Sequence, residues 1–240
     1  AKSTFSQFVL PESPLRPPQA IKNIRACSST EKLSPKSFLE NLRKTDFYTN
    51  QIKHIENISC RDVQYGTTEF PLSSKVRKTI DDKGIPQLFC HQACAIDAIR
   101  KGGSLVVSTS TSSGKSLCYN IPILEALERN QECCAIYIFP TKALAQDQCR
   151  NLKDLVKRCG YDPGIVTVYD GDTPETDRAF IRSTAQLLIT NPDMLHVSVL
   201  PVHRQFDRFL RNLEFCVLDE GHSYRGIFGS HVGMVMRRLR

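Results

Sequence analysis

The chain has 240 residues, of which 40% are hydrophobic and 24% charged, and its formal net charge is +7. These values are ordinary for a globular protein, so a sizeable core is expected. The sequence has no apolar run of the roughly 18 residues that a transmembrane helix requires, and its start lacks the apolar centre of a signal peptide, so neither membrane insertion nor secretion is expected.

The ten cysteines are scattered and include no CxxC pair. This distribution favours reduced, mostly buried thiols in an intracellular protein. The tightest cluster, Cys90, His91 and Cys94, has no second ligand pair at a finger-like distance, so it does not predict a zinc site.

The positive charge is unevenly distributed. Residues 1–83 carry 14 Lys and Arg against 9 Asp and Glu, whereas residues 84–240 carry 18 against 16. Because the larger part is nearly neutral, bulk charge alone does not predict binding to nucleic acid.

The first part of the chain is rich in Pro and Ser. Residues 1–35 are expected to form a flexible arm. Ser34-Pro35 is a typical helix start, and Phe38, Leu39 and Leu42 would share one face of a short helix. Residues 36–83 are expected to be an N-terminal extension that packs on the domain formed by residues 84–240.

From about residue 84, apolar runs of strand length alternate with helical patterns. Continuous apolar strands separated by helices predict an α/β domain with a parallel sheet covered on both faces. Pro122 is expected to kink or break the helix that follows Lys115. The predicted strands are Leu105–Ser108, Ala135–Phe139, Ile165–Tyr169, Leu187–Thr190 and Phe215–Leu218.

A phosphate-binding pattern follows the first of these strands. Thr109-Ser-Thr-Ser-Ser-Gly-Lys-Ser116 matches the P-loop pattern GxxxxGK[ST] except that Thr109 replaces the first glycine. Backbone N–H groups would hold the phosphates, Lys115 would reach the β- and γ-phosphates, and the Ser116 hydroxyl would bind Mg²⁺. A polar strand-to-helix turn is the alternative. The candidate nucleotide-binding residues of this loop are Thr111, Ser112, Ser113, Gly114, Lys115 and Ser116.

A pair of acidic residues follows the last predicted strand, in Val217-Leu-Asp-Glu-Gly-His222. Asp219 suits the aspartate that P-loop ATPases use to hold Mg²⁺, and Glu220 could deprotonate the attacking water. An acidic turn that caps the next helix is the alternative. Since strand ends converge on one crevice in a parallel sheet, the pair and the GKS loop together predict an ATPase site.

Several further segments occur in the order seen in superfamily-two helicases of the DExH kind, which the chain resembles. Phe139–Gln148 resembles motif Ia, Tyr169–Pro174 the intermediate GD segment, and Thr190–Leu195 motif Ib. Upstream, Leu88–Ala93 resembles the Q motif. The segment Glu220–Val232 is similar to the Hrq/Mrf branch of DNA helicases, and the resemblance covers roughly residues 36–240.

The resemblance implies a first RecA-like lobe at residues 84–240 and a role for each matching residue. Gln92 would recognise adenine, or else be a solvated helix residue. His222 would sense the nucleotide and couple it to a second lobe. The residues implied to track one nucleic-acid strand along its phosphates are Thr141, Lys142, Gly171, Thr190 and Asn191. For Lys142 and Asn191, helix capping is the alternative.

The expected function is that of an ATP-dependent DNA helicase or translocase that uses ATP and Mg²⁺. By resemblance it would move 3′ to 5′ on single-stranded or tailed DNA and act in DNA repair. An RNA helicase or remodeller, and a catalytically silent nucleotide-binding fragment, are the alternatives. Motif III and the second lobe are not found in these 240 residues, so the isolated chain is expected to be nearly inactive.

Overall fold

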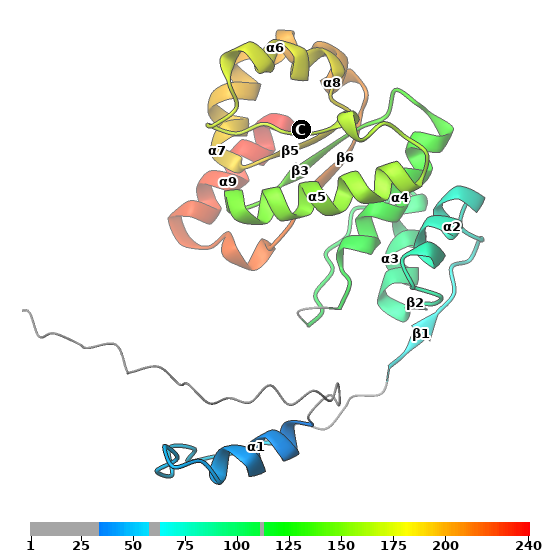
Figure 1. Ribbon diagram of the computed structural model, residues 1–240. Coiled ribbons are helices and arrows are strands. Elements are labelled where there is room, and N and C mark those ends of the chain that lie inside the picture. Colours follow the sequence, from blue (N-terminus) through cyan, green and yellow to red (C-terminus); the bar gives the residue numbers. More distant parts are fainter. Residues whose placement is uncertain (1–33, 58–62, 111–112) are drawn as a thin grey trace, which may run out of the picture. The chain divides into compact units, whose positions relative to one another are not determined.

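The computed structural model describes residues 34–57, 63–110 and 113–240 (Figure 1). The chain divides into two units, Ala1–Cys60 and Arg61–Arg240. In the first unit, the predicted short helix is confirmed as α1 (Pro35–Arg43), whose first turn is capped by Ser34. The expected flexible arm falls, apart from its last two residues, outside the described residues. No helix in the described part of the chain has the length and apolar character needed to cross a bilayer.

The second unit contains the sheet and most of the helices. Before the sheet come β1 (Tyr65–Gly66), α2 (Ser74–Asp82), β2 (Leu88–Phe89), α3 (Cys90–Arg100) and α4 (Ser116–Arg129). The sheet region comprises β3 (Cys134–Ile138), α5 (Lys142–Arg158), β4 (Val166–Val168), α6 (Glu175–Thr184), β5 (Leu187–Thr190), α7 (Pro192–Met194), α8 (Asp207–Arg211), β6 (Leu213–Leu218) and α9 (Gly226–Leu239).

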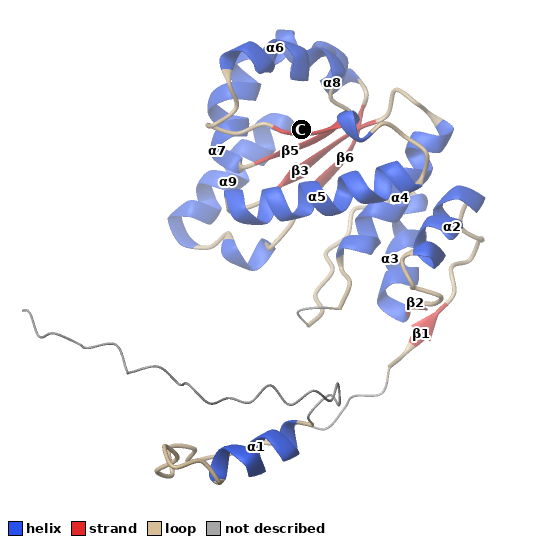
Figure 2. Ribbon diagram, viewed as in Figure 1, coloured by secondary structure: helices blue, strands red, loops and turns tan. Residues whose placement is uncertain are grey.

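The main sheet is parallel, with strand order β4-β5-β3-β6. It lies between α4 and α5 on one side and α6 to α8 on the other (Figure 2). Every residue of the central strand β3 is buried, because helices cover both faces of the sheet. Four of the five predicted strands and the three-layer α/β architecture are therefore confirmed.

Alternate residues of β3 point into two separate cores. Ala135 and Tyr137 pack with side chains from α2 to α5. Cys134, Ile136 and Ile138 pack with side chains that include those of α6, α8 and α9. This division follows from the two-residue repeat of a strand.

The predicted strand at Leu105–Ser108 is wrong in this structure. Residues 103–110 have no regular secondary structure, and the side chain of Val106 is 94% exposed. The segment is apolar and β-branched, but an extended segment becomes a strand only when its backbone groups pair with a neighbour. Among the described strands, the edge strands β4 and β6 pair only with β5 and β3, so this segment has no strand neighbour there.

Of the kink or break expected at Pro122, the break is wrong. Helix α4 continues through Pro122 to Arg129. Pro122 and the flanking residues Ile121 and Ile123 are buried. Because this apolar surface is removed from water, its burial offsets the backbone hydrogen bond that the proline ring removes.

Candidate functional site

The carboxyl ends of the parallel strands bring together residues that are far apart in sequence. The register pairs Ile138 of β3 with Thr190 of β5 and with Leu218 of β6. The residues that follow these strand ends include Asn191 and Asp219. Asn191 and Asp219 therefore follow neighbouring strands at one edge of the sheet, whereas the GKS loop does not follow a described strand of this sheet.

The GKS loop closes around its own lysine. The Lys115 ammonium group donates to the carbonyl oxygens of Ser110 at 2.8 Å and Thr109 at 3.2 Å. The hydroxyls of Thr109 and Ser113 lie 2.6 Å apart, and Ser116 begins α4. The lysine charge is therefore held inside the loop, at the amino end of a 14-residue helix, where an anion is favoured. The predicted loop residues Thr111 and Ser112 lie outside the described residues.

Two features of the loop favour glycine at position 114: its backbone conformation and the close approach of a neighbouring side chain. Gly114 has a φ of +69°, in the left-handed region that glycine enters at little cost. A Cβ at this position would lie 2.6 Å from the amide nitrogen of Gln92. Gly114 therefore allows the loop and the Gln92 side chain to approach each other.

Gln92 is buried at the start of α3 and connects that helix to the GKS loop. Its side-chain amide donates to the carbonyl of Gly114 at 2.9 Å and accepts from the backbone N–H of Phe89 at 2.9 Å. With 2% of its surface exposed, it is not the solvated helix residue of the alternative interpretation. The neighbouring His91 ring lies 3.0 Å from the carbonyl of Ser113, a contact that its spacing in the sequence did not reveal.

The Asp219 carboxylate is oriented by two donors. Its Oδ1 accepts the backbone N–H of Glu220 at 2.8 Å, and its Oδ2 accepts the hydroxyl of Tyr119 at 2.9 Å. The short helical turn Gly221–Ser223, which has Glu220 at its N-cap position, has no side-chain cap, and neither has α9, which begins at Gly226. The side chains of the acidic pair therefore cap neither helix, as the alternative interpretation required.

Tyr119 is a site residue that sequence reasoning missed. It lies on α4, four residues after Lys115, and its hydroxyl spans 100 residues of sequence to reach Asp219. Burial, followed by the negative charge of Asp219, raises the pKa of Tyr119 far above its usual value, so the hydroxyl stays a donor across the physiological range. Its spacing from Lys115, about one helical turn, was the available signal.

Glu220 occupies a strained backbone conformation beside Asp219. Its φ of +51° is left-handed, which is uncommon for a residue with a side chain. Its carboxylate lies 3.2 Å from Nδ1 of His222. The hydroxyl of Tyr224 is buried without a hydrogen-bond partner among the described residues. Burial, then the charges of Asp219 and Glu220, raise the pKa of Tyr224.

The other strand ends present hydroxyl, amide and ammonium groups. Thr141 and Asn191 cap α5 and α7 by accepting backbone N–H groups, so the capping interpretation of Asn191 is correct as far as these contacts go. Lys142 pairs instead with Asp172 at 2.6 Å. Thr190 is buried, and its hydroxyl donates to the carbonyl of Tyr169 at 2.8 Å.

The remaining predicted residue of this group is Gly171. It lies in an exposed turn after β4, which is closed by the Asp170 carboxylate accepting the backbone N–H of Asp172. Of the five residues implied to track phosphates, Thr190 is thus the one whose side chain is buried, while Lys142 is about half exposed.

The donor set at the GKS loop and the acidic pair fits a magnesium ion with a triphosphate. Ser116 supplies a hydroxyl oxygen and Asp219 a carboxylate oxygen, both hard ligands that Mg²⁺ prefers. The Lys115 ammonium and the start of α4 supply positive charge for phosphate oxygens. These residues would hold the magnesium ion and the triphosphate with oxygen ligands and positive charge alone.

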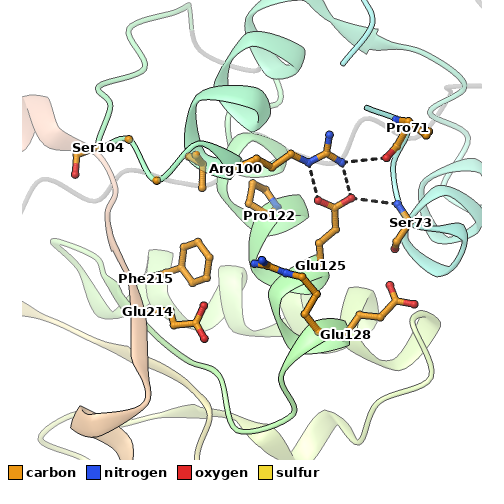
Figure 3. A pocket seen from close by; sticks show the side chains of 13 residues that line it. Pro71, Ser73, Arg100, Ser104, Pro122, Glu125, Glu128, Glu214 and Phe215 are labelled. Carbon is orange, nitrogen blue, oxygen red and sulfur yellow. Dashed lines mark hydrogen bonds and ion pairs between the residues drawn. The ribbon is translucent and has the colours of Figure 1, made fainter. Parts of the chain in front are cut away.

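A hollow of about 760 Å³ lies elsewhere on the unit (Figure 3). It is lined by residues of α4 and β6, such as Pro122 and Phe215, and by the loop around Ser104. The guanidinium of Arg100 binds both carboxylate oxygens of Glu125 at its rim, at 3.0 and 2.7 Å. None of the predicted site residues lines it, so this hollow is separate from the candidate site.

Comparison with known proteins agrees with this arrangement. A family model described as DEAD/DEAH box helicase matches residues 90–240. The chain is 43% identical over 202 residues to ATP-dependent helicase HRQ1 of Saccharomyces cerevisiae, an alignment covering 84% of this chain and 18% of that protein. It is 43% identical over 169 residues to the uncharacterized ATP-dependent helicase YprA of Bacillus subtilis, covering 70% of this chain and 22% of that protein.

Two solved structures are also similar. The crystal structure of DUF1998 helicase MrfA bound to DNA and AMPPNP matches with a TM-score of 0.75 and 37% identity, over 86% of this chain and 28% of that one. The structure of Mycobacterium smegmatis helicase Lhr bound to ssDNA and AMP-PNP matches with a TM-score of 0.57 and 27% identity, over 70% and 23%. The resemblance to the Hrq/Mrf branch and the RecA-like fold are confirmed, and the chain spans less than a third of each relative.

Proposed function

The chain belongs to the DEAD/DEAH box helicase family, and we propose on this premise that its second unit is the first motor lobe of an ATP-dependent DNA helicase or translocase. The relatives carry the name ATP-dependent helicase, and the MrfA structure was determined with DNA and AMPPNP. Both points support the proposal for this chain.

One contact carries the proposal furthest. The hydrogen bond of 2.9 Å between Tyr119 and Asp219 joins the helix that starts at the GKS loop to the end of the strand that precedes the acidic pair. This contact supports the proposal that two weak sequence patterns, separated by about a hundred residues, belong to one site. A chance GKS turn and a chance acidic turn would have no reason to meet.

Each residue of the site has a task in nucleotide hydrolysis. Lys115 would bind phosphate oxygens and neutralise their charge, while Ser116 and Asp219 would hold the metal ion. Glu220 accepts a proton from the attacking water. The magnesium ion, when bound, polarises the phosphate and neutralises the charge that develops there. Gln92 would contact adenine through the amide hydrogen that is not committed to Gly114.

The nucleic-acid strand would lie along the strand ends of β3, β4 and β5. Backbone N–H groups at helix starts, with Lys142 and the turn at Gly171, bind phosphates without reading bases. His222, 72% exposed next to Glu220, would report the state of the nucleotide to a second RecA-like lobe that completes the site. By family resemblance we assign 3′ to 5′ movement, a role in DNA repair and, in a eukaryote, a nuclear location.

ATPase and binding assays test this function. Nucleotide affinity should fall in Lys115→Ala, and ATP hydrolysis in a protein that includes the second lobe should be stimulated by single-stranded DNA. Stronger stimulation by RNA of the same sequence would favour the RNA helicase alternative, because phosphate contacts do not distinguish the two and a 2′-hydroxyl contact does. If no nucleotide binds, the chain is a silent interaction module.

A further inference from the structure

We propose that Tyr119 is a positioning residue for the metal site: its hydroxyl holds the Asp219 carboxylate in a fixed place relative to Ser116. This inference rests on the proposed function, since it takes Asp219 and Ser116 as the metal-binding residues. It concerns a residue outside the GKS loop and outside the acidic pair.

The first argument is the number of donors on the Asp219 carboxylate. An ionised carboxylate offers about four lone-pair directions. The backbone N–H of Glu220 uses one on Oδ1, and the hydroxyl of Tyr119 uses one on Oδ2. Among the described residues no further side chain donates to this carboxylate, which leaves one direction on each oxygen for a metal ion or its bound water. The two donors thus fix the plane of the carboxylate without saturating it.

The second argument is the rigidity of the Tyr119 side chain. Its ring packs edge-on against the ring of Tyr137, with centroids 5.9 Å apart. Tyr137 is completely buried in β3 and donates its own hydroxyl to Asn120, the neighbour of Tyr119 on α4, at 3.1 Å. Helix α4 is therefore fastened to the sheet directly beside the hydroxyl that reaches Asp219.

The third argument is the place of Tyr119 on α4. Ser116 is the first residue of this helix, and Tyr119 follows three positions later. Residues three apart are neighbours on the helix surface, so the two lie on the same face. Because the helix is rigid over one turn, a bond from Tyr119 to Asp219 also sets the separation between Asp219 and Ser116. Groups that orient the ligands of a metal tune its binding nearly as strongly as the ligands themselves.

The test is a magnesium titration of nucleotide binding, followed with a fluorescent non-hydrolysable ATP analogue on the full chain. In Tyr119→Phe the ring remains and the hydroxyl is lost. We expect the Mg²⁺ concentration for half-maximal binding to rise about tenfold, while affinity for the analogue in excess chelator stays unchanged. Tyr161→Phe is the matched control, since it removes a tyrosine hydroxyl from a half-buried ring that follows α5, outside the contacts that hold α4 and Asp219, and its Mg²⁺ midpoint should not move.

Asp219→Asn separates failure of this inference from failure of the proposed function. If Asp219→Asn loses the magnesium dependence and Tyr119→Phe keeps the wild-type midpoint, Tyr119 does not position the carboxylate and the inference is overturned. A fall in thermal stability of Tyr119→Phe without a shifted midpoint overturns it as well, because the hydroxyl would then be purely structural. If Asp219→Asn itself binds as wild type does, the metal assignment in the proposed function fails, and the inference fails with it.

Discussion

The side-chain amide of Gln92 donates to the carbonyl oxygen of Gly114 at a distance of 2.9 Å. Helix α3 is thereby bonded to the GKS loop at the residue whose left-handed backbone gives the loop its shape. The same amide accepts the N–H of Phe89. One buried side chain therefore provides hydrogen-bond partners both for the backbone at the start of α3 and for the backbone of the loop. The position of the loop depends on this residue as well as on its own sequence.

Gln92→Met tests this dependence. Methionine fills a similar volume but leaves the Phe89 N–H without its acceptor and the Gly114 carbonyl with the N–H of Leu117 as its remaining donor. A group that stays buried without a partner costs about 1 to 3 kcal/mol. We expect a lower free energy of unfolding in urea and weaker nucleotide binding. Gln51→Met, at an exposed position in the other unit, is the control. Wild-type affinity in Gln92→Met would show that the loop holds its shape without α3.

Lys115→Ala should greatly weaken ATP binding and leave the fold intact. The lysine supplies the charge that faces the phosphates, and in the structure it bonds carbonyls of its own loop without entering the core. Isothermal calorimetry gives the nucleotide affinity, and circular dichroism the fold. Lys153→Ala removes an exposed lysine from α5 and serves as the control. Equal affinity in the two variants would remove Lys115 from the site.

Glu220→Gln should retain ATP binding and lose turnover. The amide keeps the shape of the side chain and cannot accept a proton. Steady-state hydrolysis, measured in a protein that contains the second lobe, should fall by about 10² or more. Glu132→Gln, on the surface between α4 and β3, should have no effect. A loss of only a few-fold in Glu220→Gln would place the general base elsewhere.

The sequence predicts the buried parts of the fold well because their signal is local. Continuous apolar runs at Ala135–Phe139 and Leu187–Thr190 form strands, since both faces of each are covered. Leu105–Ser108 is also apolar. Whether it forms a strand depends on pairing with an edge strand that is distant in the sequence, and composition does not encode that pairing. Local sequence rules predict that Pro122 ends the helix, but α4 continues through it because its neighbours are buried.

The candidate site is predicted in part for a similar reason. Lys115, Asp219 and Glu220 belong to short patterns whose chemistry requires them, so spacing alone indicates them. Tyr119 has no such pattern, because a tyrosine in an apolar helix is usually a core residue. Its role depends on where the end of β6 lies relative to α4, and that relation comes from packing across 100 residues.

Lys142 provides the test of nucleic-acid binding. Its ion pair with Asp172 is exposed on both sides, at 51% and 78% of the side-chain surfaces, and such pairs contribute roughly 0 to 1 kcal/mol. The pair therefore does not prevent Lys142 from binding a phosphate. We expect affinity for single-stranded DNA to fall with salt along a shallow slope, because residues 84–240 are nearly neutral.

In Lys142→Ala, the slope of log affinity against log salt should decrease by about 0.7, the value for one phosphate contact on a single strand. Asp172→Asn should act in the opposite direction and raise affinity slightly, because it frees the ammonium group for the phosphate. Lys153→Ala, on the same helix, should leave the slope unchanged. Two strands of different base sequence should bind equally, since phosphate contacts carry no sequence information. An unchanged slope in Lys142→Ala, or strong preference for one sequence, would mean that the strand does not run along the ends of β3, β4 and β5.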